Sequence, residues 1–87
     1  MRFPRTFYAL SDPNRQKIIE LLKKNELAVA DILKHIPITG ASLSHHLTVL
    51  KTAGLISARR EGQRIICSLN LSVFEEIIQE LSKLFKK

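Results

Sequence analysis

The sequence has little of what marks secreted and membrane proteins. Cys67 is the single cysteine among 87 residues, so no internal disulfide can form, and we expect a reducing compartment. No apolar run is long enough to span a bilayer, and the first ten residues, MRFPRTFYAL, lack the apolar core of a signal peptide. We therefore expect a cytoplasmic protein without obligate membrane association.

Linkers, low-complexity tracts and internal repeats are also missing, and the length fits a single domain over residues 1–87. Hydrophobic residues make up 45% of the chain, which suffices for a folded core and argues against disorder. A domain of this size buries only a modest share of its surface, so association with a second chain would help to stabilise it.

Acidic residues are scarce. The chain has 8 of them against 14 lysines and arginines, which gives a net charge of +6 and a pI near 9.9. The positive electrostatic field of such a chain favours binding to polyanions, with nucleic acid as the first candidate and an anionic membrane surface as the second. Charge alone does not choose between these two partners.

Periodicity predicts a mainly α-helical chain with about five helices and one β-hairpin. The expected helices are a short one up to residue 10, one over residues 11–25, one over 29–35, one over 41–53 and one from residue 72 onward. Two of them, over 29–35 and 41–53, are separated by a short turn with Pro37 and Gly40, which is a helix-turn-helix pattern.

Helix-capping residues support these boundaries. Ser11 or Asp12 is suited to cap the second helix, and Thr39 the fourth, because their side-chain oxygens accept from free backbone N–H groups. Ser72 and Glu75 fit a capping box, S-x-x-E, for the last helix.

After Gly54 the hydrophobic period changes to that of two short strands, LISARR and RIICSL, joined across residues 61–63. The side chains expected to face inward are Ile65, Cys67 and Leu69. A helix-turn-helix followed by a basic hairpin is a winged helix-turn-helix, so we expect an α+β fold of about five helices plus a two-stranded wing.

The helix over 41–53 has two different sides. Leu43, Leu47 and Leu50 fall on one side, which is expected to be buried. The other side is small, polar and free of acids; it shows Ala41, His45, Thr48 and Thr52, flanked by Ser42, Ser44 and Val49. A DNA major groove accepts such a helix, because short side chains let its backbone approach the base edges.

The hairpin adds arginines, and residues 51–66 have a local charge of +3. The expected DNA-contacting residues are Thr39, Gly40, Ser42, Ser44, His45, His46, Thr48, Lys51, Arg59, Arg60 and Arg64. Two alternatives stay open: His46 lies near the buried side and either packs or binds phosphate, and the arginines either contact DNA or form a solvated strand face.

The last helix has a wide apolar stripe for the end of a small domain. Pairing across a twofold axis would bury it. The expected dimer interface contains Phe3, Phe7, Tyr8, Phe74, Ile77, Ile78, Leu81, Leu84 and Phe85. The alternatives are that the helix folds back on its own domain, or that its stripe binds a regulatory protein partner, such as a membrane-bound one that sequesters the chain.

These residues resemble the ArsR/SmtB family of winged-helix regulators. ALSDPNRQKIIELL is similar to the family's ALADPTRRRILRLL, SLSHHLTVLKTAGLI to its recognition-helix motif, and RREGQRIICSLN to its wing. The resemblance implies a homodimeric transcriptional repressor that binds double-stranded DNA at an inverted-repeat operator. Within the family, the chain is most similar to the autorepressors of the sporulation-delaying-protein operon type, which carry no metal site.

The same resemblance argues against a cofactor. The family's thiol-based metal sensors have ELCVCDL where this chain has ELAVADI, so the two cysteines fall at Ala28 and Ala30, whose methyl groups bind no metal. Asp31 remains, but alone it is expected to bond locally. Glu75, Glu76, Gln79 and Glu80 on the last helix include no histidine, and such a carboxylate set would hold zinc poorly.

Other chemistry has little support. Cys67 has no resolving partner, so a buried, inert thiol is favoured over a redox switch. Few aromatic residues are available to stack on bases, which disfavours RNA binding. No nucleophile–base pair, paired carboxylates or phosphate-binding loop is present, so we expect no enzyme.

Overall fold

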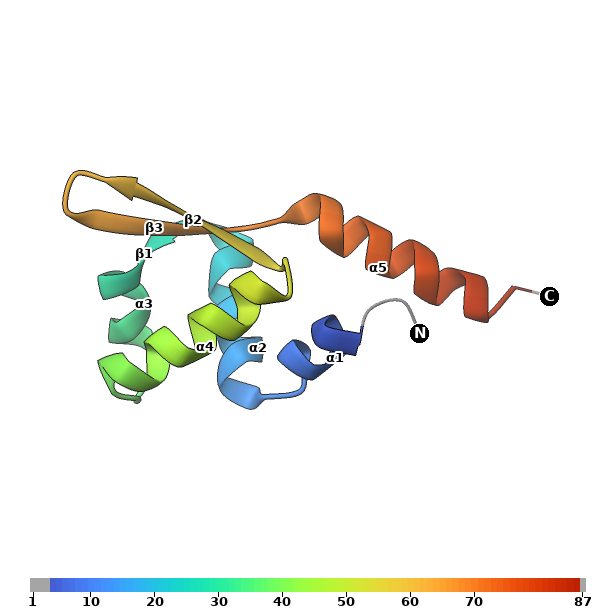
Figure 1. Cartoon of the computed structure of the whole chain (residues 1–87), viewed down its shortest axis with the longest axis horizontal. Helices are drawn as coiled ribbons and strands as arrows, with labels where there is room; N and C mark the ends of the chain where they lie inside the picture. Colours follow the sequence, from blue (N-terminus) through green and yellow to red (C-terminus); the bar gives the residue numbers. More distant parts are fainter. Residues whose placement is uncertain (1–3, 87) are drawn as a thin grey trace.

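The computed structural model describes residues 4–86. The elements along the chain are α1 (Pro4–Leu10), α2 (Pro13–Lys24), β1 (Leu27–Ala28), α3 (Val29–His35), α4 (Gly40–Thr52), β2 (Ile56–Glu61), β3 (Arg64–Leu69) and α5 (Leu71–Leu84) (Figure 1). The expected winged helix-turn-helix is confirmed: α3 and α4 form the helix-turn-helix, and β2 and β3 form the wing. None of the helices in the described range is long and apolar enough to cross a bilayer.

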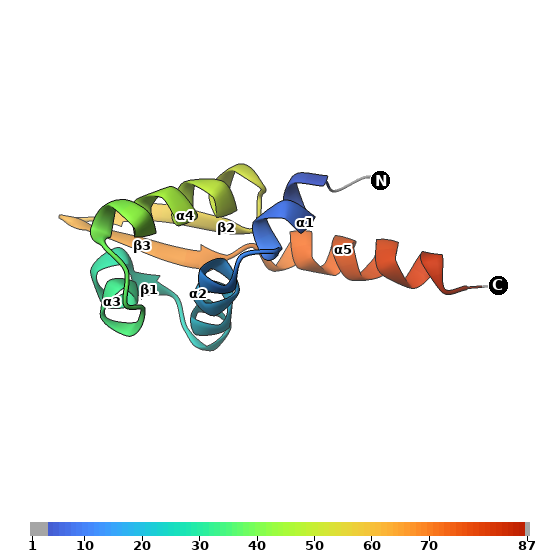
Figure 2. The same cartoon turned by 90° about the horizontal axis from the view of Figure 1, so that it is seen from below.

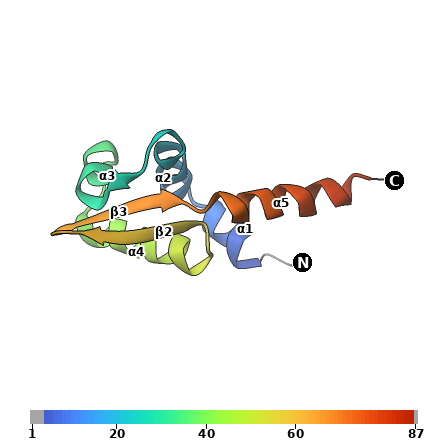
Figure 3. The same cartoon turned by 90° about the horizontal axis from the view of Figure 1, so that it is seen from above.

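The core lies between the helices and one face of the sheet, called the inner face below. Figure 1 shows the sheet nearly edge-on above α2, α3 and α4, and Figure 3 shows the opposite, outer face with helices behind it. The apolar stripes of α2 and α4 meet in this core, as their spacing predicted. The buried side chains of these two stripes are Ile18, Ile19, Leu22, Leu43, Leu47 and Leu50.

The sheet has three strands, one more than expected. Its order is β1-β3-β2 with both pairs antiparallel, and β1 pairs through Leu27↔Cys67 and Ala28↔Ile66. Two residues are too few to give a strand period in the sequence, so only pairing with β3 reveals β1. Gly54 and Gly62 have φ angles of +78° and +63°, which glycine adopts without strain, and they allow the chain to turn before β2 and at the tip of the wing.

The predicted alternation of the wing holds for the faces but not for burial, since Ile65, Cys67 and Leu69 share the inner face. Cys67 is buried in the core as expected, but Ile65 on the same face is 41% exposed, because it lies near the hairpin turn beyond the core. Ile66, which points to the outer face, is only 7% exposed. It is flanked in register by Ala28 on β1 and Arg59 on β2, and these neighbours shield it.

The helix caps agree with the sequence except at α5. Asp12 caps α2 and accepts from the Arg15 N–H at 3.0 Å, and Thr39 caps α4. The predicted capping box of Ser72 and Glu75 is wrong, because α5 begins at Leu71 with Asn70 as its N-cap. Asn70 is held there by tertiary contacts: its backbone N–H donates to the Leu55 carbonyl and its Nδ2 to the Gly54 carbonyl.

Most of α5 extends away from the other elements and so lengthens the molecule, whose overall dimensions are 49 × 23 × 20 Å (Figures 1 and 2). α1 lies at the same end of the molecule as α5, while α3 and the tip of the wing lie at the opposite end. One face of α5 therefore has no covering layer from the other residues between 4 and 86.

Candidate nucleic-acid interface

The solvent-facing side of α4 is small, polar and free of acids. Thr39 Oγ1 accepts from the Ser42 N–H at 3.1 Å and fixes the start of the helix, while its leucines hold the other side in the core. Thr48 donates its hydroxyl to the Ser44 carbonyl at 3.0 Å. The exposed residues of this element and its cap are Thr39, Gly40, Ala41, Ser44, His45, Thr48, Lys51 and Thr52, and Ser42 is half-buried.

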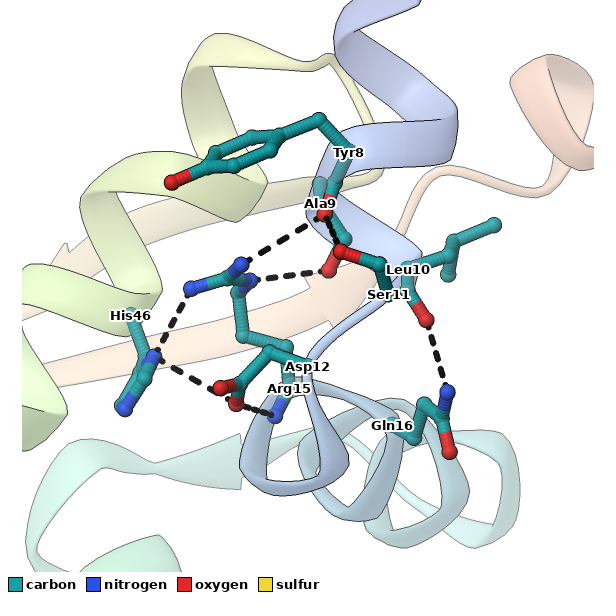
Figure 4. A network of polar contacts seen from close by, with 8 residues as sticks. All are labelled: Tyr8, Ala9, Leu10, Ser11, Asp12, Arg15, Gln16 and His46. Carbon is teal, nitrogen blue, oxygen red and sulfur yellow. Dashed lines mark hydrogen bonds and ion pairs between the residues drawn. The ribbon is translucent and has the colours of Figure 1, made fainter.

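His46 is not part of that surface. It is 8% exposed, and its Nδ1 lies 3.1 Å from Nη1 of Arg15 and 3.8 Å from Oδ2 of Asp12. Figure 4 shows these groups converging between α2 and α4. Of the two roles that the sequence left open, the burial of His46 supports packing, and His46 does not lie on the exposed side of α4.

Arg15 is the residue that the sequence analysis missed. It is 5% exposed, donates Nε–H to the Ala9 carbonyl at 2.8 Å, and lies with its guanidinium carbon 5.2 Å from the centre of the Tyr8 ring (Figure 4). A signal was present: Arg15 precedes Ile18, Ile19 and Leu22 at helical spacing, so it belongs to the buried stripe of α2. A charge on a buried stripe implies specific hydrogen-bond partners.

Two of the three wing arginines are engaged by carboxylates. Arg59 contacts both oxygens of Glu26, at 2.5 and 2.8 Å, and its Nε donates to Glu61 at 2.8 Å. Arg64 donates to Asp31 Oδ2 at 2.9 Å. The hydrogen bond from Arg59 holds the pKa of Glu26 below its ordinary value.

Arg60 differs from both of its neighbours. It pairs in register with Ile65, so it lies on the inner face of the sheet, the side on which α4 packs. Among residues 4–86, no carboxylate forms an ion pair with Arg60. The wing thus places Arg60, a cation without a carboxylate partner, on the same side of the sheet as α4.

Tyr8 and Arg5 on α1 lie beside α4. Together with His45, Thr48 and Val49 they line an open hollow along the exposed side of that helix. Tyr8, which the sequence assigned to the dimer interface, is 63% exposed and covers Arg15. A tyrosine on the first helix therefore lies close to the candidate DNA surface.

The expected dimer residues separate into two groups. Ile77 is buried in the core of its own domain, and Phe7 and Phe74 are half-buried against it, so Ile77 is not available as interface. Phe3 lies outside the described residues. The exposed apolar side chains on and just after α5 are Leu71, Ile78, Leu81, Leu84 and Phe85.

The positions of the family's metal ligands hold groups that are unsuitable or already engaged. Ala28 is buried and Ala30 is exposed, and Asp31 bonds Arg64 through one oxygen and Lys34 through the other, at 3.5 Å. Within the described part of the chain, no three His, Cys, Asp or Glu residues form a group suited to a metal ion. Burial raises the pKa of the Cys67 thiol and so disfavours the reactive thiolate.

Comparison with known sequences gives one consistent result. The family described as "Bacterial regulatory protein, arsR family" matches residues 12–58. The transcriptional repressor SdpR of Bacillus subtilis (strain 168) is 43% identical over 81 residues, which cover 93% of this chain and 90% of SdpR. The arsenical resistance operon repressor of Staphylococcus aureus is 36% identical and covers 84% of this chain and 70% of its own length.

Solved structures agree on the fold. NolR from Sinorhizobium fredii is 30% identical, with a TM-score of 0.75 over 93% of this chain and 81% of NolR. An ArsR-like transcriptional regulator from Rhodococcus sp. RHA1 has a TM-score of 0.86 at 21% identity, over 94% of this chain and 77% of its own, and supports the fold alone.

Proposed function

The chain belongs to the arsR family of bacterial regulatory proteins and is a transcriptional repressor, not an enzyme, and we propose that it acts as a homodimer on an inverted-repeat operator. In this proposal the α4 helices of two subunits enter successive major grooves about 34 Å apart. The bound dimer represses by occluding a promoter in the cytoplasm, and its own promoter is the first to test.

One observation carries the DNA contact: an acid-free exposed side of α4 and an unpaired Arg60 lie on the same side of the sheet. Hydroxyl and imidazole groups such as those of Ser44 and His45 hydrogen-bond base edges or phosphates. Arg60 adds a phosphate or minor-groove contact from the wing. The net charge of +6 on each subunit favours the approach of both to DNA.

The exposed apolar residues on and just after α5 support the homodimer. This surface, called the α5 patch, consists of Leu71, Ile78, Leu81, Leu84 and Phe85. Leu84 is 68% and Phe85 is 85% exposed, and no other described part of the chain covers this face of α5. A twofold axis would bury the same patch on both copies. Each large apolar side chain that becomes buried contributes about 1.5–3 kcal/mol.

Repression without a metal signal is the third part of the proposal. It is supported by methyl groups at positions 28 and 30 and by the engagement of Asp31 with Arg64 and Lys34. Adding Zn²⁺, Cd²⁺ or arsenite, each at micromolar concentration, should leave DNA affinity unchanged. Release of DNA by any of the three would contradict this part alone.

The DNA assignment is tested with purified protein and duplexes that it enriches from a random pool. We expect His45→Ala to lower the preference for an enriched duplex over a shuffled one, because it removes a base-facing group. Arg60→Ala should weaken binding to both duplexes and reduce the salt slope by about one. Unchanged affinity of both variants, measured by fluorescence anisotropy at two salt concentrations, would rule out this surface.

A second candidate function uses the same α5 patch for another protein. In that case the chain is a monomer until a regulatory partner binds. Light scattering of the purified protein separates the two: a dimeric mass supports the homodimer, and a monomeric mass supports the protein-interaction module.

A further inference from the structure

The outer face of the wing carries a row of alternating charges. Arg59 pairs in register with Ile66, and Glu61 with Arg64, so these side chains share one face. Glu26 precedes Ala28 by two residues, and Ala28 also pairs with Ile66, which places Glu26 on the same face across the central strand.

Two of the carboxylates come from outside the hairpin. Glu26 precedes β1 and contacts Arg59 with both oxygens, and Asp31 on α3 contacts Arg64 at 2.9 Å. Both pairs join residues 33 positions apart in the chain. Arginine binds a carboxylate and a phosphate through the same planar donors, so each acid occupies the groups that would otherwise grip DNA.

The charges of this network of ion pairs cancel. Three cations, Arg59, Arg64 and Lys34, contact three carboxylates, those of Glu26, Glu61 and Asp31. The network therefore has no net charge to attract phosphate, whereas the unpaired Arg60 lies on the inner face of the sheet, on the side of α4.

The geometry also separates two modes of DNA binding. When α4 lies in a major groove, the outer face of the wing is directed away from the duplex, because α4 lies on the inner side of the sheet. On DNA without an operator, no base contact fixes this orientation, and any exposed cation contributes to binding. Free arginines on the outer face would then strengthen binding to random DNA only.

We propose that Glu26 and Asp31 act as internal substitutes for phosphate: by engaging Arg59 and Arg64 they weaken binding to random DNA and so preserve preference for the operator. This inference rests on the proposed DNA-binding function. Glu26 and Asp31 are thus specificity-determining residues that touch no DNA themselves.

The test compares Glu26→Gln and Asp31→Asn with a matched control, Glu20→Gln. Glu20 is exposed on α2 and forms no ion pair within residues 4–86, and its substitution changes the net charge by the same amount. Anisotropy is measured with a duplex enriched by the wild-type protein and with a shuffled duplex of equal length, each at 50 and 200 mM salt.

We expect Glu26→Gln and Asp31→Asn to bind the shuffled duplex more tightly than Glu20→Gln does. This gain in affinity should be about threefold larger at 50 mM than at 200 mM salt, because one further phosphate contact adds about 0.9 to the salt slope. Affinity for the enriched duplex should stay within about twofold of wild type, so the preference for it falls. Equal urea midpoints establish that all variants fold alike.

A double variant, Glu26→Gln with Arg59→Ala, tests whether the acid acts through the arginine. Its affinity for the shuffled duplex should equal that of a matched double variant, Glu20→Gln with Arg59→Ala, which has the same net charge. The inference is overturned if Glu26→Gln matches Glu20→Gln, if its gain persists without Arg59, or if the enriched duplex gains as much as the shuffled one. A wild-type protein that prefers no duplex would instead overturn the proposed function.

Discussion

Arg15 Nη1 in α2 lies 3.1 Å from Nδ1 of His46 in α4, and both side chains are buried (Figure 4). A guanidinium only donates, so His46 Nδ1 is the acceptor of this hydrogen bond. Arg15 also donates to the carbonyls of Tyr8 and Ala9 at the end of α1. One side chain thus joins α1, α2 and the helix proposed to read DNA.

Replacing this arginine should be costly. We expect Arg15→Ala to lower the free energy of unfolding by about 2–3 kcal/mol, because it removes charge-assisted hydrogen bonds and leaves the buried Ala9 carbonyl unpaired. Arg15→Lys should recover little of it, since an ammonium lacks the planar donors that reach several acceptors. Urea denaturation measures both, and a loss below about 0.5 kcal/mol in Arg15→Ala would contradict a structural role.

The two adjacent histidines should respond oppositely to substitution. His46→Ala should destabilise the protein by about 1–2 kcal/mol, because Arg15 loses a buried acceptor. His45→Ala, on the exposed side of α4, should leave the unfolding midpoint unchanged. Thermal and urea unfolding of the two variants check this, and equal stability losses would show that the assignment of the two faces is mistaken.

The α5 patch predicts an effect of charge on association. Ile78→Glu or Leu84→Glu should convert the proposed dimer to a monomer, because a carboxylate would be buried without a partner. Gln79→Glu is the control, since it adds the same charge to an exposed polar position of the same helix. Light scattering gives the mass of each; a dimeric Leu84→Glu together with a dimeric Ile78→Glu would place the interface elsewhere.

Asp12 should make stability depend on pH in the acid range. The Arg15 N–H bond holds the pKa of the Asp12 carboxyl below its ordinary value of 3.8, so the folded state favours the ionised form. This stabilisation is present above pH 3.8 and decreases as the pH falls from there through the lowered pKa. The free energy of unfolding of wild type should exceed that of Asp12→Ala by about 1 kcal/mol at neutral pH. This difference should become smaller as the pH falls through the lowered pKa.

Asp12→Asn separates the charge from the cap. Asparagine also accepts the N-cap hydrogen bond but does not titrate. The difference in the free energy of unfolding between Asp12→Asn and Asp12→Ala should therefore be constant from pH 7 to pH 3. Urea unfolding at a series of pH values provides the comparison. A wild-type advantage that grows toward low pH would have the wrong sign for a lowered pKa.

Local patterns in the sequence determined the order of the five helices and the two wing strands, and which side of α4 is exposed. Leucines at 43, 47 and 50 need only helical periodicity to share a side, and Asp12 and Thr39 cap α2 and α4 through contacts three residues apart. The absence of cysteines at positions 28 and 30 is equally visible in the chain alone. Such features depend on residues a few positions apart, so sequence inspection suffices for them.

Tertiary structure alone decided which of the predicted residues remain available for binding. His46 and Ile77 each lie next to an exposed residue, His45 and Ile78. Only the packing of the helices shows that His46 and Ile77 themselves are buried. The contacts that engage Arg59, Arg64 and His46 join residues 33, 33 and 31 positions apart. No local period encodes such pairs, because their meeting depends on how β1, α2 and α3 pack against the wing and α4.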